Sequence, residues 1–228
     1  MDSLQKFLLA APMLLLAMVA HEYAHGWAAR SQGDHTAESL GRLTFNPLKH
    51  IDPVLTVLLP AMLWFATSGA FVFGGAKPVP VDPRNYRQLK RGDIIVSLAG
   101  IATNLVLAVL LIIGTMALGV LGRAVPALND SLSLLQMMFR WGIVMNFVLA
   151  VFNLFPLPPL DGSHVMKWLL PPAWRARYVQ LGAFGFGIML LLLTIGRPII
   201  AAWMAPVTWL NALASQALQP FVLLGPWS

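Results

Sequence analysis

The sequence contains no cysteine and very little charge. Without cysteine, disulfides and thiolate metal sites are excluded, so histidine, aspartate and glutamate remain as the side chains able to bind a metal. Charged residues make up only 11% of the 228 residues, whereas a soluble domain has about 25%. Hydrophobic residues reach 58%, and several apolar runs approach the roughly 20 residues that a helix needs to cross a bilayer. The composition therefore predicts a multi-pass membrane protein.

Hydropathy predicts an all-α fold organised as one membrane domain over residues 1–228, with a core at about residues 1–165 and additional helices over 166–228. Residues 54–73 are apolar but contain Pro60 and Gly69, which predicts a re-entrant hairpin or a bent helix. Residues 74–83 are too rich in proline and glycine for a helix and predict a short extended segment or hairpin. Membrane helices are predicted over residues 3–30, 93–122, 134–155, 179–195 and 199–213.

The net charge is +6. In a membrane protein, basic residues set the orientation of the helices in the bilayer and contact anionic lipid, so this charge does not predict a nucleic-acid partner. Basic residues are densest in residues 77–91 and 167–177, and we expect both groups on the cytoplasmic side of the membrane. Two predicted spans lie between them, so the short connection at residues 123–133 would face outward. The composition, rich in arginine and proline with little lysine, indicates a prokaryotic source, so we expect the protein in the inner or plasma membrane of a prokaryote.

The sequence His21-Glu22-Tyr23-Ala24-His25 ends an apolar run in which residues 7–20 carry no charge. On a helix, residues i and i+4 share a face, so both imidazoles can bind one Zn²⁺ while Glu22 handles a proton. Ionisable groups at this depth are costly and usually mark function. We therefore expect metal-assisted hydrolysis inside a bilayer, with the active site towards the cytoplasm.

A catalytic zinc needs a third protein ligand and an open position for water. Asp161 is the best candidate, because it follows the predicted span 134–155 and so lies on the same side of the membrane as the histidines. Pro156, Pro158 and Pro159 end that helix and allow the chain to bend the carboxylate back towards the metal. A turn role for the Asp161-Gly162 pair is the alternative.

Together these segments resemble the site-2 protease family of intramembrane zinc metalloproteases, in a compact form without a PDZ domain. His21–His25 match the family's HExxH motif, and residues 153–162 match its Asn…Pro…LDG motif. Residues 99–104 match its Gly-Pro-x-x-Asn helix, with Ile101 in place of proline. The connection at residues 123–133 is too short for a PDZ domain.

The resemblance implies one Zn²⁺ per chain, bound by His21, His25 and Asp161, with Glu22 as general base. It also implies that Asn153 and Asn104 lie near the substrate cleft. The substrate would be a membrane-anchored protein, cut in or near its transmembrane segment, whose unwound chain pairs with residues 74–81 as an added strand. A regulatory membrane partner or a homo-oligomer stays open.

Several alternatives accompany these expectations. A metal transporter would need further ionisable residues along its spans, and residues 94–122 contain none. An inactive relative acting as a membrane scaffold would have lost Glu22 or a ligand, yet all are present. Asn104 has the alternative of a hydrogen bond to a neighbouring helix, and Asn153 that of satisfying the broken helix end. His164, three residues after Asp161, is not assigned a role.

Overall fold

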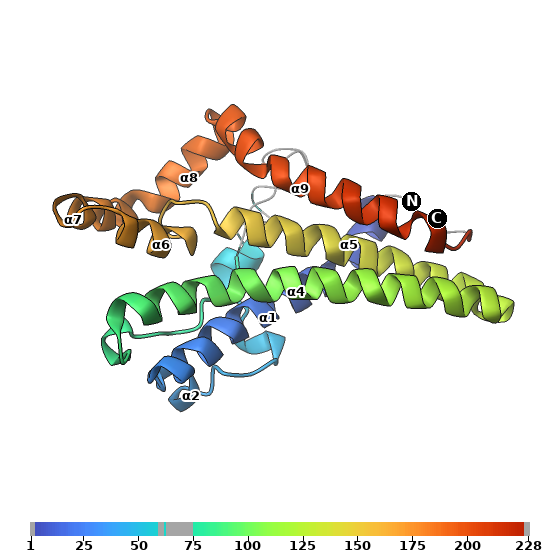
Figure 1. Ribbon diagram of the computed structural model, residues 1–228, viewed down its shortest axis with the longest axis horizontal. Helices are drawn as coiled ribbons and strands as arrows, with labels where there is room; N and C mark the ends of the chain where they lie inside the picture. Colours follow the sequence, from blue (N-terminus) through green and yellow to red (C-terminus); the bar gives the residue numbers. More distant parts are fainter. Residues whose placement is uncertain (1–2, 59–61, 63–74, 226–228) are drawn as a thin grey trace. The chain divides into compact units, whose positions relative to one another are not determined.

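The computed structural model describes residues 3–58, 62 and 75–225, and Figure 1 shows its helices. Contacts divide the chain into two compact units, which we call the bundle unit (residues 1–17 and 101–228) and the histidine unit (residues 18–100). Two long helices, α1 (Ser3–Gln32) and α4 (Leu89–Ala124), contribute one part to each unit.

Helices dominate the described residues. The remaining α-helices are α2 (Thr36–Ser39), α5 (Asn129–Asn153), α6 (Gly162–Leu169), α7 (Pro172–Gln180), α8 (Gly185–Thr194) and α9 (Arg197–Leu218). Short 3-10 turns occur at Pro47–Lys49, Pro83–Asn85, Pro126–Leu128, Leu181–Phe184 and Gln219–Phe221, and Pro53–Leu58 form a π-helix. Five described stretches are long and apolar enough to span a membrane: Leu8–Gln32, Leu89–Ala124, Pro126–Asn153, Pro172–Thr194 and Arg197–Phe221. The prediction of a multi-pass helical membrane protein is confirmed.

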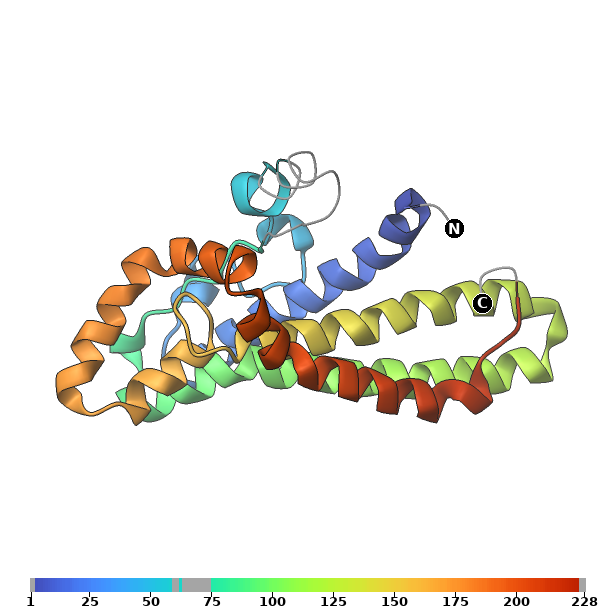
Figure 2. The same cartoon turned by 90° about the horizontal axis from the view of Figure 1, so that it is seen from above.

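The bundle unit is built around α5 and α9, which run side by side in Figures 1 and 2. Its core contains Ala108, Ile143, Phe147, Val207, Ala214 and Leu218. Polar side chains inside this apolar core are paired with one another or with the backbone. Gln136, only 3% exposed, donates to the carbonyls of Thr115 and Phe221, at 2.8 and 2.9 Å, and accepts the N–H of Leu223 at 3.0 Å. The bilayer core has no water to satisfy polar groups, so these groups must bond to one another. The bonds of Gln136 thereby attach residues 221–223 to the bundle.

The histidine unit contains a small apolar cluster of Ala28, Ala29, Tyr86 and Val96, through which α1 packs on the start of α4. Asp34 lies just beyond α1 and is 1% exposed. Its carboxylate accepts hydrogen bonds from Thr36 N (3.1 Å), Thr36 Oγ1 (2.5 Å), Asp82 N (2.7 Å) and Asn85 Nδ2 (2.9 Å). Burial alone would raise the pKa of Asp34, but these donors outweigh it and lower the pKa below its ordinary value of 3.8. Asp34 thereby connects the end of α1 to the start of α2 and to residues 82–85.

The helix bounds differ from the predicted ones mainly at polar ends. Helix α4 begins at Leu89, four residues before the predicted start, and α5 begins at Asn129, five residues before it. Residues 75–82 form neither helix nor strand, and no strand occurs among the described residues, so the structure does not show the predicted β element. Most of the predicted re-entrant segment, residues 54–73, lies outside the described residues.

Candidate metal centre

His21 and His25 lie one turn apart on the same face of α1. Their Nε2 atoms are 3.0 Å apart, and their rings stand nearly perpendicular, with an interplanar angle of 84°. Both side chains are buried, at 7% and 9% exposed. The i, i+4 spacing thus gives the convergence of imidazole nitrogens that the sequence predicts.

The second ring nitrogen of His25 is held by α4. His25 Nδ1 lies 2.7 Å from the carbonyl oxygen of Val96, and a carbonyl can only accept, so Nδ1 carries the proton. The lone pair of neutral His25 is then on Nε2, which faces His21. Metal-binding histidines are commonly oriented in this way by a carbonyl on the far nitrogen.

This donor set fits zinc. Two nitrogens bound at the usual 2.0–2.1 Å to a tetrahedral ion lie roughly 3.3 Å apart, close to the separation of the two Nε2 atoms here. Neutral imidazoles are borderline ligands that suit zinc, and the chain has no thiolate to compete with them. The Val96 carbonyl fixes His25 in the tautomer that binding requires.

Gly100 of α4 provides the space for the two rings. A Cβ at this position would lie 2.6 Å from His21 Cε1, 2.6 Å from His25 Nε2 and 2.7 Å from His21 Nδ1. All three distances are shorter than a carbon tolerates without displacement of its neighbours. Only glycine therefore lets α4 approach both imidazoles while its Val96 carbonyl, one turn earlier, binds His25.

Glu22 follows His21, and its carboxylate has a backbone partner in the same unit. Oε2 accepts a hydrogen bond from the backbone N–H of Val79 at 2.7 Å. Val79 is 6% exposed and belongs to the irregular segment 75–82, whereas Glu22 is half-buried. Within the histidine unit, the structure thus places His21, Glu22 and His25 together with two backbone groups that sequence motifs do not encode.

Asp161 belongs to the bundle unit, where it is half-buried at the N-terminal end of α6. The chain between α5 and α6 folds back tightly, because a Cβ on Gly162 would collide with the carbonyl oxygen and carbon of Leu154 and lie 2.8 Å from Phe155 O. Glycine after Asp161 is therefore required by this turn. The turn fixes where the Asp161 backbone leaves the end of α5.

The two candidate substrate-binding asparagines have partners inside the bundle unit. Asn104 is fully buried, and its Nδ2 donates to Asn146 Oδ1 at 2.8 Å and to Ala17 O at 3.3 Å. It links α4, α5 and α1, as in the interhelical alternative. Asn153 Nδ2 donates to Leu149 O of its own helix at 3.0 Å. A role of either residue in substrate binding stays a prediction.

One known protein family matches most of the chain. A sequence profile of Peptidase family M50 matches residues 9–194. The chain belongs to peptidase family M50. This is the site-2 protease family, so the resemblance drawn from the motifs is confirmed, and no PDZ domain occurs in the described part of the chain.

Two bacterial proteins illustrate the similarity within family M50. The chain is 38% identical over 179 residues to zinc metalloprotease YwhC of Bacillus subtilis. This alignment covers 78% of this chain and 77% of that protein. The chain is 34% identical over 201 residues to zinc metalloprotease Rip2 of Mycolicibacterium smegmatis, covering 86% of this chain and 70% of that protein. No solved structure matches the chain.

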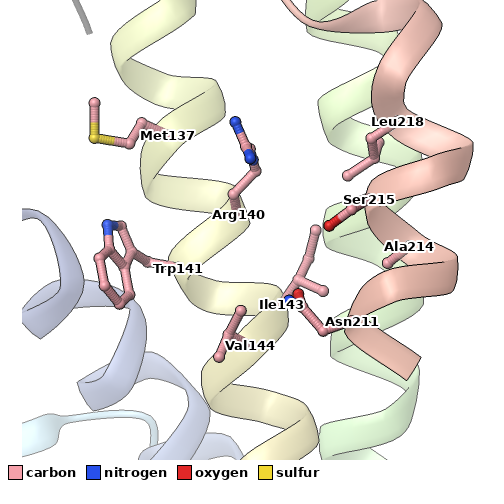
Figure 3. A pocket seen from close by; sticks show the side chains of 9 residues that line it. All are labelled: Met137, Arg140, Trp141, Ile143, Val144, Asn211, Ala214, Ser215 and Leu218. Atoms are coloured by element: carbon pink, nitrogen blue, oxygen red, sulfur yellow. The ribbon is translucent and has the colours of Figure 1, made fainter. Parts of the chain in front are cut away.

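A separate pocket of about 290 Å³ lies in the bundle unit of this M50 protein, between α5 and α9 (Figure 3). Arg140 of α5 and Asn211 and Ser215 of α9 contribute polar groups to it, and Figure 3 shows Arg140 and Ser215 on its facing sides. None of the predicted site residues lines this pocket.

Three features around the candidate site were not identified as such from the sequence: the Val96 carbonyl, the Val79 amide and the space at Gly100. Backbone groups carry no signal in residue type, so the first two could not have been found. Gly100 was part of the matched motif, and a glycine inside an otherwise apolar helix is a recognisable sign of close approach.

Proposed function

We propose that this protein is an intramembrane zinc metalloprotease that hydrolyses a peptide bond in or near a transmembrane segment of a membrane-anchored protein. Such cleavage would serve regulated intramembrane proteolysis at a prokaryotic cell membrane. Three findings support this activity: membership in family M50, five membrane-length apolar helices among the described residues, and relatives named zinc metalloproteases.

The observation that carries the proposal is the His21–His25 pair, buried on a membrane helix with its Nε2 atoms 3.0 Å apart. The Val96 carbonyl lies 2.7 Å from Nδ1 of His25 and so leaves Nε2 of that ring as the nitrogen that can bind a metal. The adjacent carboxylate of Glu22 adds a base one residue away, which is the combination that hydrolysis requires.

In this proposal His21, His25 and Asp161 hold one zinc ion. When bound, zinc supplies an activated water at neutral pH and polarises the scissile carbonyl. Glu22 accepts the proton of the attacking water and returns it to the leaving amine. The imidazoles of His21 and His25 are buried and the Glu22 carboxylate is half-buried, so little bulk water reaches them. Exclusion of water strengthens electrostatic interactions among these groups.

The substrate must present an unwound peptide bond, because a helix encloses its carbonyls in i→i−4 hydrogen bonds. We expect helix-breaking residues in a substrate span to favour cleavage. Asn153 and Asn104 are proposed to lie near the substrate path, and the basic residues of 77–91 and 167–177 support an active site towards the cytoplasm.

The test combines zinc content with cleavage of a synthetic transmembrane peptide by purified protein. We compare the wild type with Glu22→Gln, using Glu38→Gln as the matched control because Glu38 is an exposed residue that pairs with Arg30 and His35. Stoichiometric zinc in all three proteins, with cleavage lost only in Glu22→Gln, supports the proposal. Cleavage by Glu22→Gln at the wild-type rate, or absence of zinc from the wild type, overturns it.

A further inference from the structure

We propose that the backbone amide of Val79 is the group that positions the general base Glu22. This inference rests on the proposed function and deepens it. The Val79 N–H donates to Glu22 Oε2 at 2.7 Å, a distance typical of hydrogen bonds to an ionised acceptor. The bond joins two points 57 residues apart within the histidine unit, so it is set by the fold of that unit.

Two prolines make this amide a single, directed donor. Pro78 and Pro80 flank Val79 and have no N–H, so Val79 carries the only backbone donor among these three residues. A residue before proline is also restricted to extended or polyproline conformations, which limits the directions in which the Val79 amide can point. The sequence Pro78-Val79-Pro80 thus presents one N–H in a stiff backbone.

The segment that carries Val79 is held by other parts of the histidine unit. Lys77 N donates to His50 O at 2.8 Å, and His50 is itself 2% exposed. One Nη2 of Arg42 donates to the carbonyls of Lys77 at 3.1 Å and Pro78 at 3.2 Å. Three backbone groups that precede the Val79 amide, the N–H of Lys77 and the carbonyls of Lys77 and Pro78, are therefore hydrogen-bonded within the unit.

The side chain of Val79 adds a packing contact with α1. A Cβ on Gly26 would lie 3.0 Å from Val79 Cγ1, which shows how closely Val79 packs on this helix. Gly26 is four residues after Glu22, so both lie on the same face of α1. Val79 is consequently anchored by its side chain one turn from the carboxylate that its amide binds.

This arrangement restricts the conformations of Glu22. A glutamate side chain has three rotatable torsions, and one oxygen held by a fixed donor leaves the other for proton transfer. Correct placement of a catalytic group is a large part of enzymatic rate, and loss of an orienting partner at a metal site typically costs about 10–100-fold. The Val79 amide accordingly serves the enzyme's own carboxylate in this structure, in contrast to the predicted pairing of this segment with a substrate strand.

The kinetic test removes the amide and leaves the carboxylate. Val79→Pro deletes the N–H in a backbone already flanked by prolines, and we expect kcat to fall about 10–100-fold with KM and zinc content unchanged. Val79→Ala keeps the amide and should lose less kcat than Val79→Pro. Val79→Ala is therefore the matched control, because it shortens the side chain that packs on Gly26 without removing the N–H, so a fall in kcat shared by both variants would come from packing and not from the amide.

A second measurement needs no activity. In ¹⁵N-valine-labelled protein, the Val79 amide proton should resonate downfield and move upfield in Glu22→Ala, while the Val81 amide stays in place. If Val79→Pro does not fold, replacement of the Val79 amide by an ester removes the same N–H. Three outcomes overturn the inference. The first is a wild-type kcat in protein that lacks the Val79 N–H, and the second is a loss of activity that a changed KM or lost zinc explains. The third is a Val79 amide chemical shift that stays the same in Glu22→Ala. Absence of cleavage by wild type, with the amide shift present, overturns the proposed function instead.

Discussion

Gly100→Ala gives the sharpest test of how α4 shapes the histidine pair. The added methyl group would lie 2.6–2.7 Å from three imidazole atoms of His21 and His25. The rings can make room for the methyl group only by tilting, and His25 then lengthens its 2.7 Å hydrogen bond to Val96. Overpacking of this kind costs about 1–3 kcal/mol.

We expect this strain to act mainly on metal binding. Without metal the rings can tilt away from the methyl group, whereas a bound ion requires both Nε2 atoms to converge. A strain of about 1–3 kcal/mol borne only by the bound state weakens zinc binding about 5- to 150-fold. Thermal stability of the metal-free protein should change less, because the relaxed rings avoid most of the clash.

The assay is a competition titration with a zinc chelator on metal-free protein. Gly114→Ala is the matched control, since Gly114 lies on α4 against the end of the Phe139 ring, with a Cβ distance of 2.8 Å, and touches no histidine. It should retain wild-type zinc affinity. Folded Gly100→Ala protein that binds zinc as tightly as the wild type would refute the geometry described for α4.

Three further predictions concern the surrounding structure. The folded-state pKa of Asp34 lies below 3.8, so the ionised carboxylate stabilises the fold at neutral pH, and this stabilisation is lost as the pH falls through the lowered pKa. Thermal melts of Asp34→Ala should therefore show a lower melting temperature than the wild type at pH 7 and a weaker dependence of that temperature on acid pH. A double-mutant cycle of Asn104→Leu and Asn146→Leu should give a coupling of about 0.5–1.7 kcal/mol, measured by unfolding in detergent, and additive effects would contradict the buried 2.8 Å bond. Gly162→Ala should lower zinc content by displacing the Asp161 turn, and zinc analysis of purified protein checks this.

The spans were predictable because long apolar runs leave few alternatives in a bilayer, but their ends were not. Helix α4 starts at Leu89 and includes Lys90 and Arg91, which a hydropathy criterion excludes. Helical hydrogen bonding does not require apolar side chains, so the helix continues beyond the hydrophobic run. The predicted span over residues 179–195 begins earlier, at Pro172, and includes a 3-10 turn at Leu181–Phe184.

The candidate site was predictable as far as residue type and spacing determine it. The histidine pair follows from i, i+4 geometry, which depends only on local helix structure. The Val96 carbonyl and the Val79 amide depend on which backbone groups other segments bring to α1, and any residue type can offer them. Asn104 shows the complementary difficulty, because its side chain suits both a substrate contact and the hydrogen bond to Asn146 that the structure contains.

The Val96 carbonyl and Gly100 stand four residues apart on one face of α4, so His25 depends on the rotational setting of a second helix. Turning α4 by a single residue, about 100°, would replace the carbonyl acceptor and fill the glycine notch with a side chain. Transplanting this pair of histidines onto an isolated amphipathic helix would therefore reproduce the ligands without their orientation. A designer who wishes to copy the centre must copy the facing turn of α4 as well.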